Sequence, residues 1–416
     1  MYKLRPYQEE AVEAALRAFD KNKPFIVQAA TGAGKSLMIA EICHRLNEPV
    51  LILQPSKELL EQNYDKLSSY GIDDIGIYSA SKNSRQIAKF TYATVGSIFR
   101  RPELFSHFKH VIIDECHGVN PKNISGMYTK FLKSIDCKKV CGLTATPYRI
   151  TQKYEKDKKG FLYSTSVLKT LMRIGFPTFW SGGIVYKVET PELIEQGFLS
   201  PIDYFAPHVD LTDLKVNSTG ADYTESSLEV FWDDRRLRAL ADTIQEIDGK
   251  CQRNLIFCSS IRQGERACEM LNQYWLDARM VTGDTQTKER EQIVSDFRAG
   301  KFKHLINVSC FTTGFDVPEL DSIVLARPTM SLALYYQMVG RGVRLDPNKP
   351  DKRLSVYDLA GCMERLGRVE TIRLVKNETG YQDQVVSDAG IMSDKPLFSF
   401  QVPGKAKLAK SLPPAP

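Results

Sequence analysis

Short runs of apolar residues alternate with helical patterns over the first third of the chain. Short, mainly apolar runs of this kind are typical of strands buried on both faces of a sheet. The runs span residues 25–30, 50–54, 110–113 and 140–144. Amphipathic helical patterns follow most of them, and one is predicted to begin after Ser56, a residue type that favours the N-cap. The alternation predicts an α/β domain over residues 1–148, built on a parallel sheet covered by helices.

The alternation breaks between residues 149 and 200. Residues 149–173 contain seven Lys/Arg and two acids, with aromatic residues interleaved. Short strands around a Gly182-Gly183 turn follow, and then a helix that is predicted to end at Gly197. We interpret this stretch as a basic, aromatic insertion followed by a linker.

A second series of strands and helices occupies residues 201–362, without an obvious sequence repeat of the first. Its predicted strands are residues 254–259, 278–284, 303–310, 322–328 and 353–360. Helical patterns lie between several of them, so a second α/β domain is expected. Residues 363–416 form a short extension whose Pro- and Lys-rich tail is expected to be poorly ordered.

Composition narrows the class of protein. The chain has 416 residues, 43% hydrophobic and 25% charged, which is typical of a folded soluble protein. No apolar run approaches the ~18–20 residues that span a membrane, and the N-terminus lacks the apolar core of a secretory signal. We therefore expect a cytoplasmic protein without a membrane partner. Nine cysteines are scattered without a CxxC pair, so buried, reduced thiols are expected rather than disulfides or a zinc site.

Charge is unevenly distributed along the chain. Residues 1–200 carry 28 Lys/Arg and 20 Asp/Glu, a net charge of +8, whereas residues 201–416 carry 28 and 30, a net charge of −2. The excess is either a chance imbalance on a soluble surface or a surface for an anionic partner. Residues 149–173 alone contribute +5 (7 − 2), and this concentration favours the anionic partner.

The sequence AATGAGKS at 29–36 lies between a predicted strand and a predicted helix. It has the spacing of a phosphate-binding P-loop, with Ala29 in the first glycine position. Glycines let the backbone curl so that its N–H groups point at phosphate oxygens, and the helix N-terminus adds a favourable dipole. Lys35 is expected to reach the β and γ phosphates, and the Ser36 hydroxyl to bind Mg²⁺. The residues expected to cradle the nucleotide are Thr31, Gly32, Ala33, Gly34, Lys35 and Ser36.

The sequence VIIDECH at 111–117 places two acids at the end of a buried strand. Asp114 is expected to hold Mg²⁺, and Glu115 to orient or deprotonate the attacking water, with His117 beside them. Together with the P-loop, this pattern predicts hydrolysis of a nucleoside triphosphate.

With these motifs in place, nearly the whole chain resembles the superfamily 2 helicases. LRPYQ, AATGAGKS, DECH, LTATP, LIFCSS, NVSCFTTGFDVP and QMVGRGVR occur in the family's order. The resemblance implies two RecA-like parallel-sheet domains in tandem, with ATP and Mg²⁺ bound in the cleft between them. It also implies that Arg5 and Gln8 contact the adenine and that Gly314 and Asp316 meet the nucleotide.

The last of these motifs supplies basic residues from the second domain. Gln337, Arg341 and Arg344 are spaced to face one side of a helix or its end. A guanidinium keeps its charge and its planar fork suits phosphate. Arg344 is expected to act as the arginine finger and Arg341 as a second γ-phosphate contact, or the reverse. Within the superfamily, the motifs look most like those of the bacterial RadD group and related phage helicases, although the last cysteine is Cys362 and a cysteine-rich zinc module is not seen.

The resemblance also implies nucleic-acid contacts on both domains. They are short polar side chains and backbone amides, which suit a grip on phosphates without sequence readout. The candidates are Gln54, Pro55, Ser56, Thr94, Gly96, Ser97, Ser259, Arg262, Thr282, Gly283 and Asp284. Lys156, Lys158 and Lys159 are added from the basic insertion, which either grips nucleic acid or is a solvated insertion.

The leading hypothesis is an ATP-dependent DNA helicase or translocase. It would act on single-stranded or branched DNA in repair, recombination or replication, including branch migration, as a monomer in a bacterial or phage-infected cell and associated with the nucleoid. Three alternatives stay open: an RNA helicase, the motor subunit of a restriction system, and an inactive nucleic-acid-binding module.

Overall fold

A computed structural model describes most of the chain and divides it into two compact units. The described residues are 3–119, 126–156, 162–170, 179–217, 222–310, 317–376, 383–391 and 396–397. The first unit comprises Met1–Arg149 and Lys169–Leu193, and the second comprises Ile150–Leu168 and Ile194–Pro416. Each unit is built on its own parallel sheet.

The first unit contains an eight-stranded sheet with the order β10-β1-β7-β6-β2-β5-β3-β4. Its pairings are parallel except for that of β3 with the edge strand β4. The strands are β1 Phe25–Ala29, β2 Val50–Gln54, β3 Ile75–Ser79, β4 Ser84–Arg85, β5 Phe90–Thr94, β6 His110–Asp114, β7 Lys139–Thr144 and β10 Ile184–Val188. The four apolar runs at the start of the sequence therefore became β1, β2, β6 and β7.

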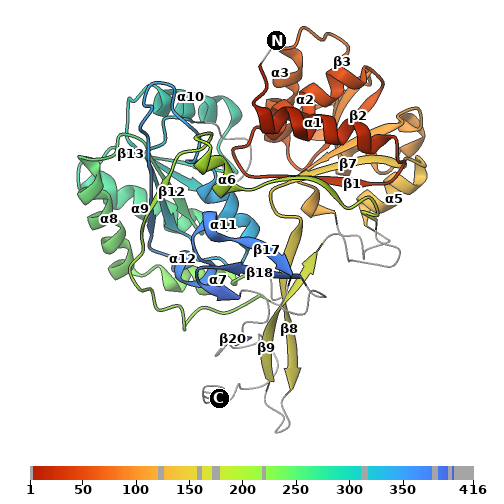
Figure 1. Cartoon of the computed structure of the whole chain (residues 1–416). Coiled ribbons are helices and arrows are strands. Elements are labelled where there is room, and N and C mark those ends of the chain that lie inside the picture. Colours follow the sequence, from red (N-terminus) through yellow and green to blue (C-terminus); the bar gives the residue numbers. More distant parts are fainter. Residues whose placement is uncertain are drawn as a thin grey trace. The chain divides into compact units, whose positions relative to one another are not determined.

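Helices cover this sheet (Figure 1). They are α1 Pro6–Phe19, α2 Lys35–Leu46, α3 Lys57–Ser68, α4 Val95–Ile98 and α5 Met127–Ser134, with short 3₁₀ turns η1 Ala80–Lys82, η2 Pro102–Phe105 and η3 Cys116–Gly118. Helix α1 packs on α2, and α2 on α3. Around α5, Phe105, Phe108 and Phe131 are buried against alternate strand residues such as Val111 and Ile113. The strands are thus apolar because both of their faces are covered.

Strand β10 changes the predicted domain organisation. Residues 149–200 were expected to form an insertion and a linker, yet Ile184–Val188 pair in parallel with β1. The chain therefore returns to the first sheet after residue 170 and adds an edge strand to it. The other predicted domain boundaries stay predictions.

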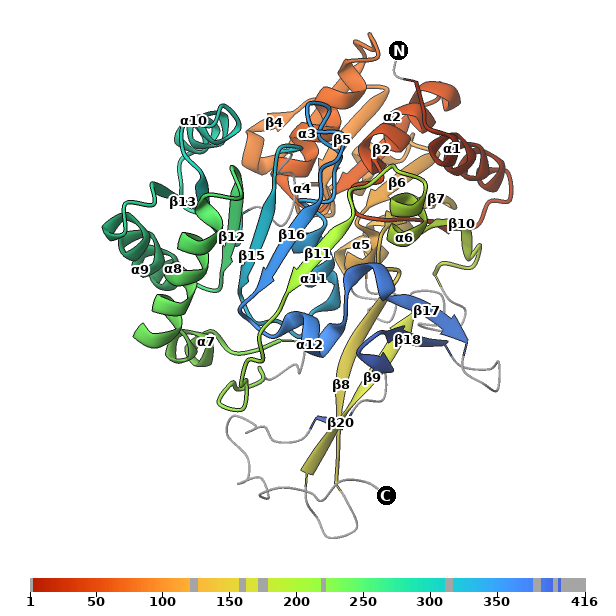
Figure 2. The ribbon, with the colours of Figure 1, turned by 60° about the vertical axis from the view of Figure 1, so that its left-hand side comes forward.

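The second unit contains a six-stranded parallel sheet with the order β11-β16-β15-β12-β14-β13 (Figure 2). The strands are β11 Ile202–Phe205, β12 Asn254–Cys258, β13 Ala278–Thr282, β14 His304–Val308, β15 Ser322–Ala326 and β16 Leu354–Asp358. Five of them match predicted strands. Strand β11 was not predicted, because its four residues show neither a full apolar run nor a clear alternation.

The helices of this unit are α7 Glu225–Phe231, α8 Asp234–Asp248, α9 Ile261–Gln273, α10 Thr287–Arg298, α11 Leu332–Val339 and α12 Cys362–Leu366, with η5 Val369–Thr371. Helix α6, Thr190–Glu195, crosses the boundary between the units. Trp232 at the end of α7, Leu240 of α8 and Leu271 of α9 are buried together with Ile256 and Ile306 of the sheet. This apolar layer forms the core of the second unit.

Two small sheets lie outside the main ones. Strands β8 Tyr148–Lys156 and β9 Leu162–Thr170 pair with each other, and β9 also pairs with β20 Pro396–Leu397. Strands β17 Arg373–Lys376, β18 Asp383–Ser387 and β19 Gly390–Ile391 form an antiparallel sheet in the C-terminal extension. The basic insertion is therefore built around paired strands.

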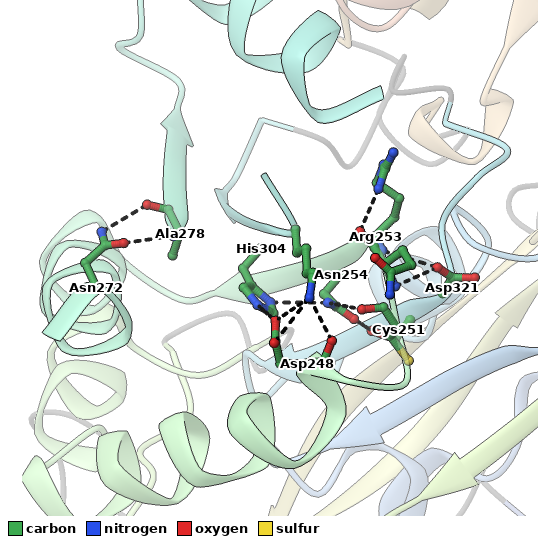
Figure 3. A network of polar contacts seen from close by, with 11 residues as sticks. Asp248, Cys251, Arg253, Asn254, Asn272, Ala278, His304 and Asp321 are labelled. Atoms are coloured by element: carbon green, nitrogen blue, oxygen red, sulfur yellow. Dashed lines mark hydrogen bonds and ion pairs between the residues drawn. The ribbon is translucent and has the colours of Figure 1, made fainter. Parts of the chain in front are cut away.

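Polar side chains join the amino ends of β12, β14 and β15 (Figure 3). Asn254 Nδ2 lies 3.2 Å from His304 Nδ1, and His304 Nε2 lies 3.0 Å from Asp248 Oδ1. Asn254 also accepts a hydrogen bond from the hydroxyl of Ser322. His304 and Asn254 are buried, so this network satisfies polar groups that the sheet covers.

All nine cysteines are free thiols, seven of them buried. In the described part of the chain, no group of three or more His, Cys, Asp or Glu side chains could hold a metal ion by itself. No described helix is both long and apolar enough to cross a membrane.

Candidate nucleotide site

The P-loop connects β1 to α2. Gly32 and Gly34 have φ values of 85° and 82°, in the left-handed region that favours glycine. Gly34 is the N-cap of α2, so Lys35 and Ser36 stand in the first turn of the helix. The loop therefore points backbone N–H groups and a helix N-terminus at the space in which phosphates would sit.

Helix α1 supports the P-loop from behind. Tyr7 Oη and Gln8 Nε2 both donate to the Ala33 carbonyl, at 3.1 and 2.9 Å. The backbone N–H of Arg5 donates to Gln8 Oε1 at 3.0 Å, which fixes the orientation of the amide. Gln8 was predicted to contact an adenine, and in this structure its amide holds the P-loop. Tyr7 was not identified from the sequence, because a buried tyrosine in a helix has no distinctive spacing.

The two acids of the DECH sequence stand at the carboxyl end of β6. Glu115 has a φ of 47°, a left-handed conformation that is unusual for a residue with a side chain. Its Oε1 lies 3.3 Å from Lys35 Nζ. The structure thus brings together the P-loop lysine and the predicted base, which are far apart in the sequence.

Burial and charge act differently on these two acids. Burial and the neighbouring Glu115 charge raise the pKa of Asp114, although Lys35 and Asn63 oppose this. Burial also disfavours the charged form of Glu115, but Lys35 and His117 outweigh it and hold the pKa of Glu115 well below its usual range. The result is an ionised Glu115 beside an Asp114 whose charge would be favoured by a nearby cation.

His117 and Thr144 complete the cluster around Glu115. His117 Nδ1 lies 3.2 Å from Glu115 Oε2 and 2.9 Å from Thr144 Oγ1. The Thr144 hydroxyl also lies 3.4 Å from Glu115 Oε2 and accepts from the Thr146 N–H at 3.1 Å. Thr144 and Thr146 belong to LTATP, so this sequence is linked directly to the predicted base.

The donor set near the P-loop fits a magnesium ion. Asp114 supplies carboxylate oxygens and Ser36 a hydroxyl, and Mg²⁺ prefers such oxygen ligands. Asn63 of α3 donates to Asp114 Oδ2 at 3.1 Å, and the Glu115 N–H donates to Asp114 Oδ1 at 3.0 Å. These bonds orient the carboxylate in the way that outer partners orient metal ligands. Asn63 was missed because nothing in the spacing of α3 distinguishes it.

The predicted arginines belong to the second unit. Gln337 lies in the last turn of α11, which ends at Val339, so Arg341 and Arg344 follow in a turn instead of standing on the helix. Arg341 is 8% exposed. Burial and the charge of Arg298 lower the pKa of Arg344 to about 10. Arg344 remains a cation at neutral pH, and a nearby anion would stabilise its charge.

Most predicted nucleic-acid contacts lie at the carboxyl ends of strands or in the loops and helix starts that follow them. Pro55, Gly96, Arg262, Gly283 and Asp284 are exposed, and Ser56, Thr94, Ser97 and Ser259 are half-buried. Thr94 Oγ1 lies 2.8 Å from Ser97 Oγ, which accepts from the Ala80 N–H at 2.9 Å. These hydroxyls therefore stabilise the loops that would face a strand.

Two of these predictions require correction. Gln54 is fully buried, because the last residue of the central strand β2 points into the interior. Thr282 is also buried, and its hydroxyl accepts from the Asp284 N–H at 3.2 Å. The Thr282 side chain therefore shapes its loop, and neither side chain is exposed to a ligand.

Some predicted residues lie outside the described part of the chain. They are Gly314, Asp316, Lys158 and Lys159. Lys156 is the last residue of β8.

Comparison with known families accounts for both units. Residues 1–149 match the model of the type III restriction enzyme res subunit, and residues 235–346 match the helicase conserved C-terminal domain. The chain belongs to the superfamily 2 helicases. The order of the two matches is that of the predicted motifs.

Relatives within superfamily 2 extend the likeness over most of the chain. A Schizosaccharomyces pombe protein provisionally named mitochondrial ATP-dependent helicase irc3 is 30% identical over 84% of this chain and 56% of its own length. The DNA 3'-5' translocase XPB2 of Sulfurisphaera tokodaii is 24% identical over 86% of this chain and 81% of its own. The chain thus spans little more than half of the length of the Schizosaccharomyces pombe relative.

A solved structure supports the superfamily 2 fold. A fragment from Vibrio vulnificus, provisionally described as the HsdR subunit of a type I restriction enzyme, superposes with a TM-score of 0.62 at 19% identity. The superposition covers 94% of this chain and 70% of the Vibrio vulnificus chain. At this identity the likeness concerns the fold alone.

Proposed function

We propose that the protein is an ATP-dependent DNA translocase or helicase that acts on single-stranded or branched DNA. The observation that carries the proposal is the Lys35–Glu115–His117–Thr144 cluster beside a P-loop with two left-handed glycines. The relative named as a DNA translocase supports DNA as the nucleic acid. Repair, recombination and replication are the processes in which such DNA arises.

The cluster gives each residue a role in ATP hydrolysis. Lys35 would bind the β and γ phosphates, and Ser36 and Asp114 would hold Mg²⁺, which neutralises phosphate charge. Glu115 would orient the attacking water and accept its proton. Since Lys35 pairs with Glu115 at 3.3 Å, a phosphate that draws Lys35 away would raise the pKa of Glu115 and make it a stronger base.

The second unit would complete the reaction. Arg341 and Arg344 would stabilise the charge that develops on the γ-phosphate, as arginine fingers do. Because these arginines and the P-loop stand in different units, ATP would bind in the cleft between two domains that close on it. Closure and reopening would then step the protein along one strand.

A panel of nucleic acids tests this proposal. ATPase and unwinding are measured with single-stranded, forked and junction DNA and with RNA of matched length. We expect DNA to stimulate turnover at least tenfold, and the stimulation to fall steeply with salt because the contacts are to phosphates. Lys35→Ala should abolish turnover, and Glu115→Gln should bind ATP without hydrolysing it. A wild type without nucleic-acid-stimulated ATPase would exclude the proposal.

Two other activities are distinguished from the proposed one, the first by the same panel and the second by co-purification. Stronger stimulation by RNA than by every DNA would make the protein an RNA helicase. The match of residues 1–149 to a restriction-enzyme subunit favours a second candidate, the motor of a restriction system. A motor of that kind should co-purify with a nuclease or methyltransferase and support ATP-dependent DNA cleavage.

A further inference from the structure

A buried lysine lies behind the turn that carries the two arginines. Lys352 is 2% exposed and stands just before β16. Its Nζ donates to the carbonyls of Pro318, Gly342 and Arg344 at 2.6, 2.9 and 2.7 Å. An ammonium group has three N–H donors, so each one is used by a backbone oxygen.

These three carbonyls belong to two functional segments. Pro318 ends the NVSCFTTGFDVP sequence, and Gly342 and Arg344 belong to QMVGRGVR. Strand β15 lies between the two segments in the sequence, and the second segment begins in the last turn of helix α11. Lys352 therefore links the last residue of NVSCFTTGFDVP to the backbone of QMVGRGVR.

A second residue holds the same turn from another side. The Ser200 N–H donates to the Val343 carbonyl at 2.7 Å, and its hydroxyl donates to the Arg344 carbonyl at 3.2 Å. Ser200 is fully buried and lies shortly before β11. The carbonyl of Arg344 thus accepts from two side chains, which restricts the backbone from which that arginine projects.

We propose that Lys352 is a positioning residue for ATP hydrolysis, which fixes the backbone of the Gly342–Arg344 turn so that Arg341 and Arg344 are preorganised. The proposal rests on the proposed ATPase function. A placement error of about 1 Å in a catalytic group can cost ~10²-fold in rate, so a rigid turn has a kinetic value. Lys352 acts through the turn and does not touch the nucleotide.

A neutral residue in place of Lys352 could not donate a hydrogen bond to all three carbonyls. A methionine has a similar length but no donor, so the Pro318 and Gly342 carbonyls would lose the hydrogen bonds from Lys352, and the Arg344 carbonyl would retain the one from Ser200. The turn would rearrange to recover hydrogen bonds. A glutamine would keep part of the donor set on a shorter side chain.

Four variants test the proposal: Lys352→Met, Lys352→Gln, Lys349→Met and Arg344→Ala. Lys349 lies on the same turn before β16, but it pairs with Asp321 at 2.7 Å and its side chain is 56% exposed, so it controls for the loss of a lysine. For each variant, kcat and KM for ATP are measured with saturating DNA. We expect both Lys352→Met and Arg344→Ala to lower kcat at least tenfold and to change KM less than threefold, while Lys349→Met stays near wild type.

The double variant Lys352→Met/Arg344→Ala distinguishes positioning from general damage. If Lys352 acts through these arginines, its loss should slow Arg344→Ala much less than it slows the wild type, since only the placement of Arg341 is then left to disturb. Losses that multiply, or a folded Lys352→Met with wild-type kcat, would overturn the proposal. If Lys352→Met is insoluble, Lys352→Gln carries the same comparison, with a smaller expected loss.

Hydrogen exchange tests the positioning role of Lys352 independently of the proposed ATPase function. We expect amides in a peptide spanning residues 340–345 to exchange faster in Lys352→Met or Lys352→Gln than in Lys349→Met. Unchanged exchange would overturn the positioning role whether or not the protein hydrolyses ATP. Faster exchange in a protein without ATPase would instead refute the proposed function and leave the contact between Lys352 and the turn established.

Discussion

The side-chain amide of Asn63 donates a hydrogen bond to Asp114 Oδ2 at 3.1 Å, and both residues are buried. Asn63 belongs to α3, the helix that begins after Pro55 and Ser56, whereas Asp114 ends β6. The helix that follows two predicted nucleic-acid contacts, Pro55 and Ser56, thus holds the carboxylate predicted to bind Mg²⁺. Within the first unit, this contact links the region predicted to bind nucleic acid to the residue predicted to bind Mg²⁺.

Replacing Asn63 should weaken magnesium binding. Asn63→Leu keeps the volume but removes the donor, which leaves the pKa of Asp114 still higher and its carboxylate less well oriented. Loss of such an outer partner typically costs ~10–100-fold in metal affinity. We expect the Mg²⁺ concentration for half-maximal ATPase to rise about tenfold or more. Asp65→Asn, an exposed change on the same helix, should leave it unchanged; equal Mg²⁺ curves for both variants would refute the role of Asn63.

Gly34 is sterically required in the P-loop. A Cβ at this position would lie 2.5 Å from Gln8 Nε2, and the φ of 82° disfavours any side chain by ~1–2 kcal/mol. Gly34→Ala should therefore displace Gln8 from the Ala33 carbonyl and raise the KM for ATP about tenfold. Gly249→Ala, at a position with a negative φ and open space, is the matched control. Wild-type ATP binding by Gly34→Ala would contradict the contact between α1 and the loop.

Thr144 should act through its hydroxyl. Thr144→Val removes the group that contacts His117, Glu115 and the Thr146 N–H, and one lost buried hydrogen bond of ~1.4 kcal/mol corresponds to a tenfold change. We expect DNA-stimulated kcat to fall roughly tenfold. Thr144→Ser retains the hydroxyl and should keep most of the activity. Equal loss in both variants would point to the methyl group and its packing instead.

Acidic pH should destabilise the second unit through the network of His304 and Asp248 (Figure 3). Burial lowers the pKa of His304, although Asp248 opposes this, so the unfolded chain takes up a proton before the folded one. Stability is then lost as pH falls below the pKa of an unfolded histidine, ~6.5. Burial also opposes the ionisation of Asp248, yet His304 and Lys303 hold its pKa below the usual range, which adds a loss at lower pH.

Thermal melts between pH 8 and pH 5 measure this effect. The melting temperature should fall with pH in the wild type and fall less in His304→Gln. His110 is also buried with a lowered pKa, so part of the slope should remain. His208→Gln, a change on the surface, should keep the full slope. An unchanged slope in His304→Gln would show that the network does not control the acid transition.

The basic insertion should matter for DNA affinity if it grips nucleic acid. Neutralising Lys153, Lys156, Lys158 and Lys159 together should lower DNA affinity and flatten its dependence on salt, since each phosphate contact contributes to that slope. Neutralising Lys158 and Lys159 alone is compared with neutralising the exposed Lys21 and Lys23, which changes the net charge by the same amount. Unchanged affinity and unchanged DNA-stimulated ATPase would leave the solvated insertion as the correct interpretation.

The sequence by itself determined the elements whose chemistry is local. Consecutive apolar residues are stable as strands only when both faces are covered, so β1, β2, β6 and β7 could be predicted from the pattern alone. The P-loop and the DECH acids could be predicted for a similar reason, because glycine spacing and a strand end largely fix what the backbone can do there.

Only the tertiary structure decided which distant groups meet. Tyr7 and Gln8 on the Ala33 carbonyl, Asn63 on Asp114, and Lys352 on three carbonyls depend on how helices and strands pack, and a hydrogen bond between residues far apart leaves no periodic trace in the sequence. The burial of Gln54 and Thr282, two polar residues at strand ends, was likewise decided by the packing. Residue type and spacing specify the reactive groups, whereas packing specifies the partners that orient them.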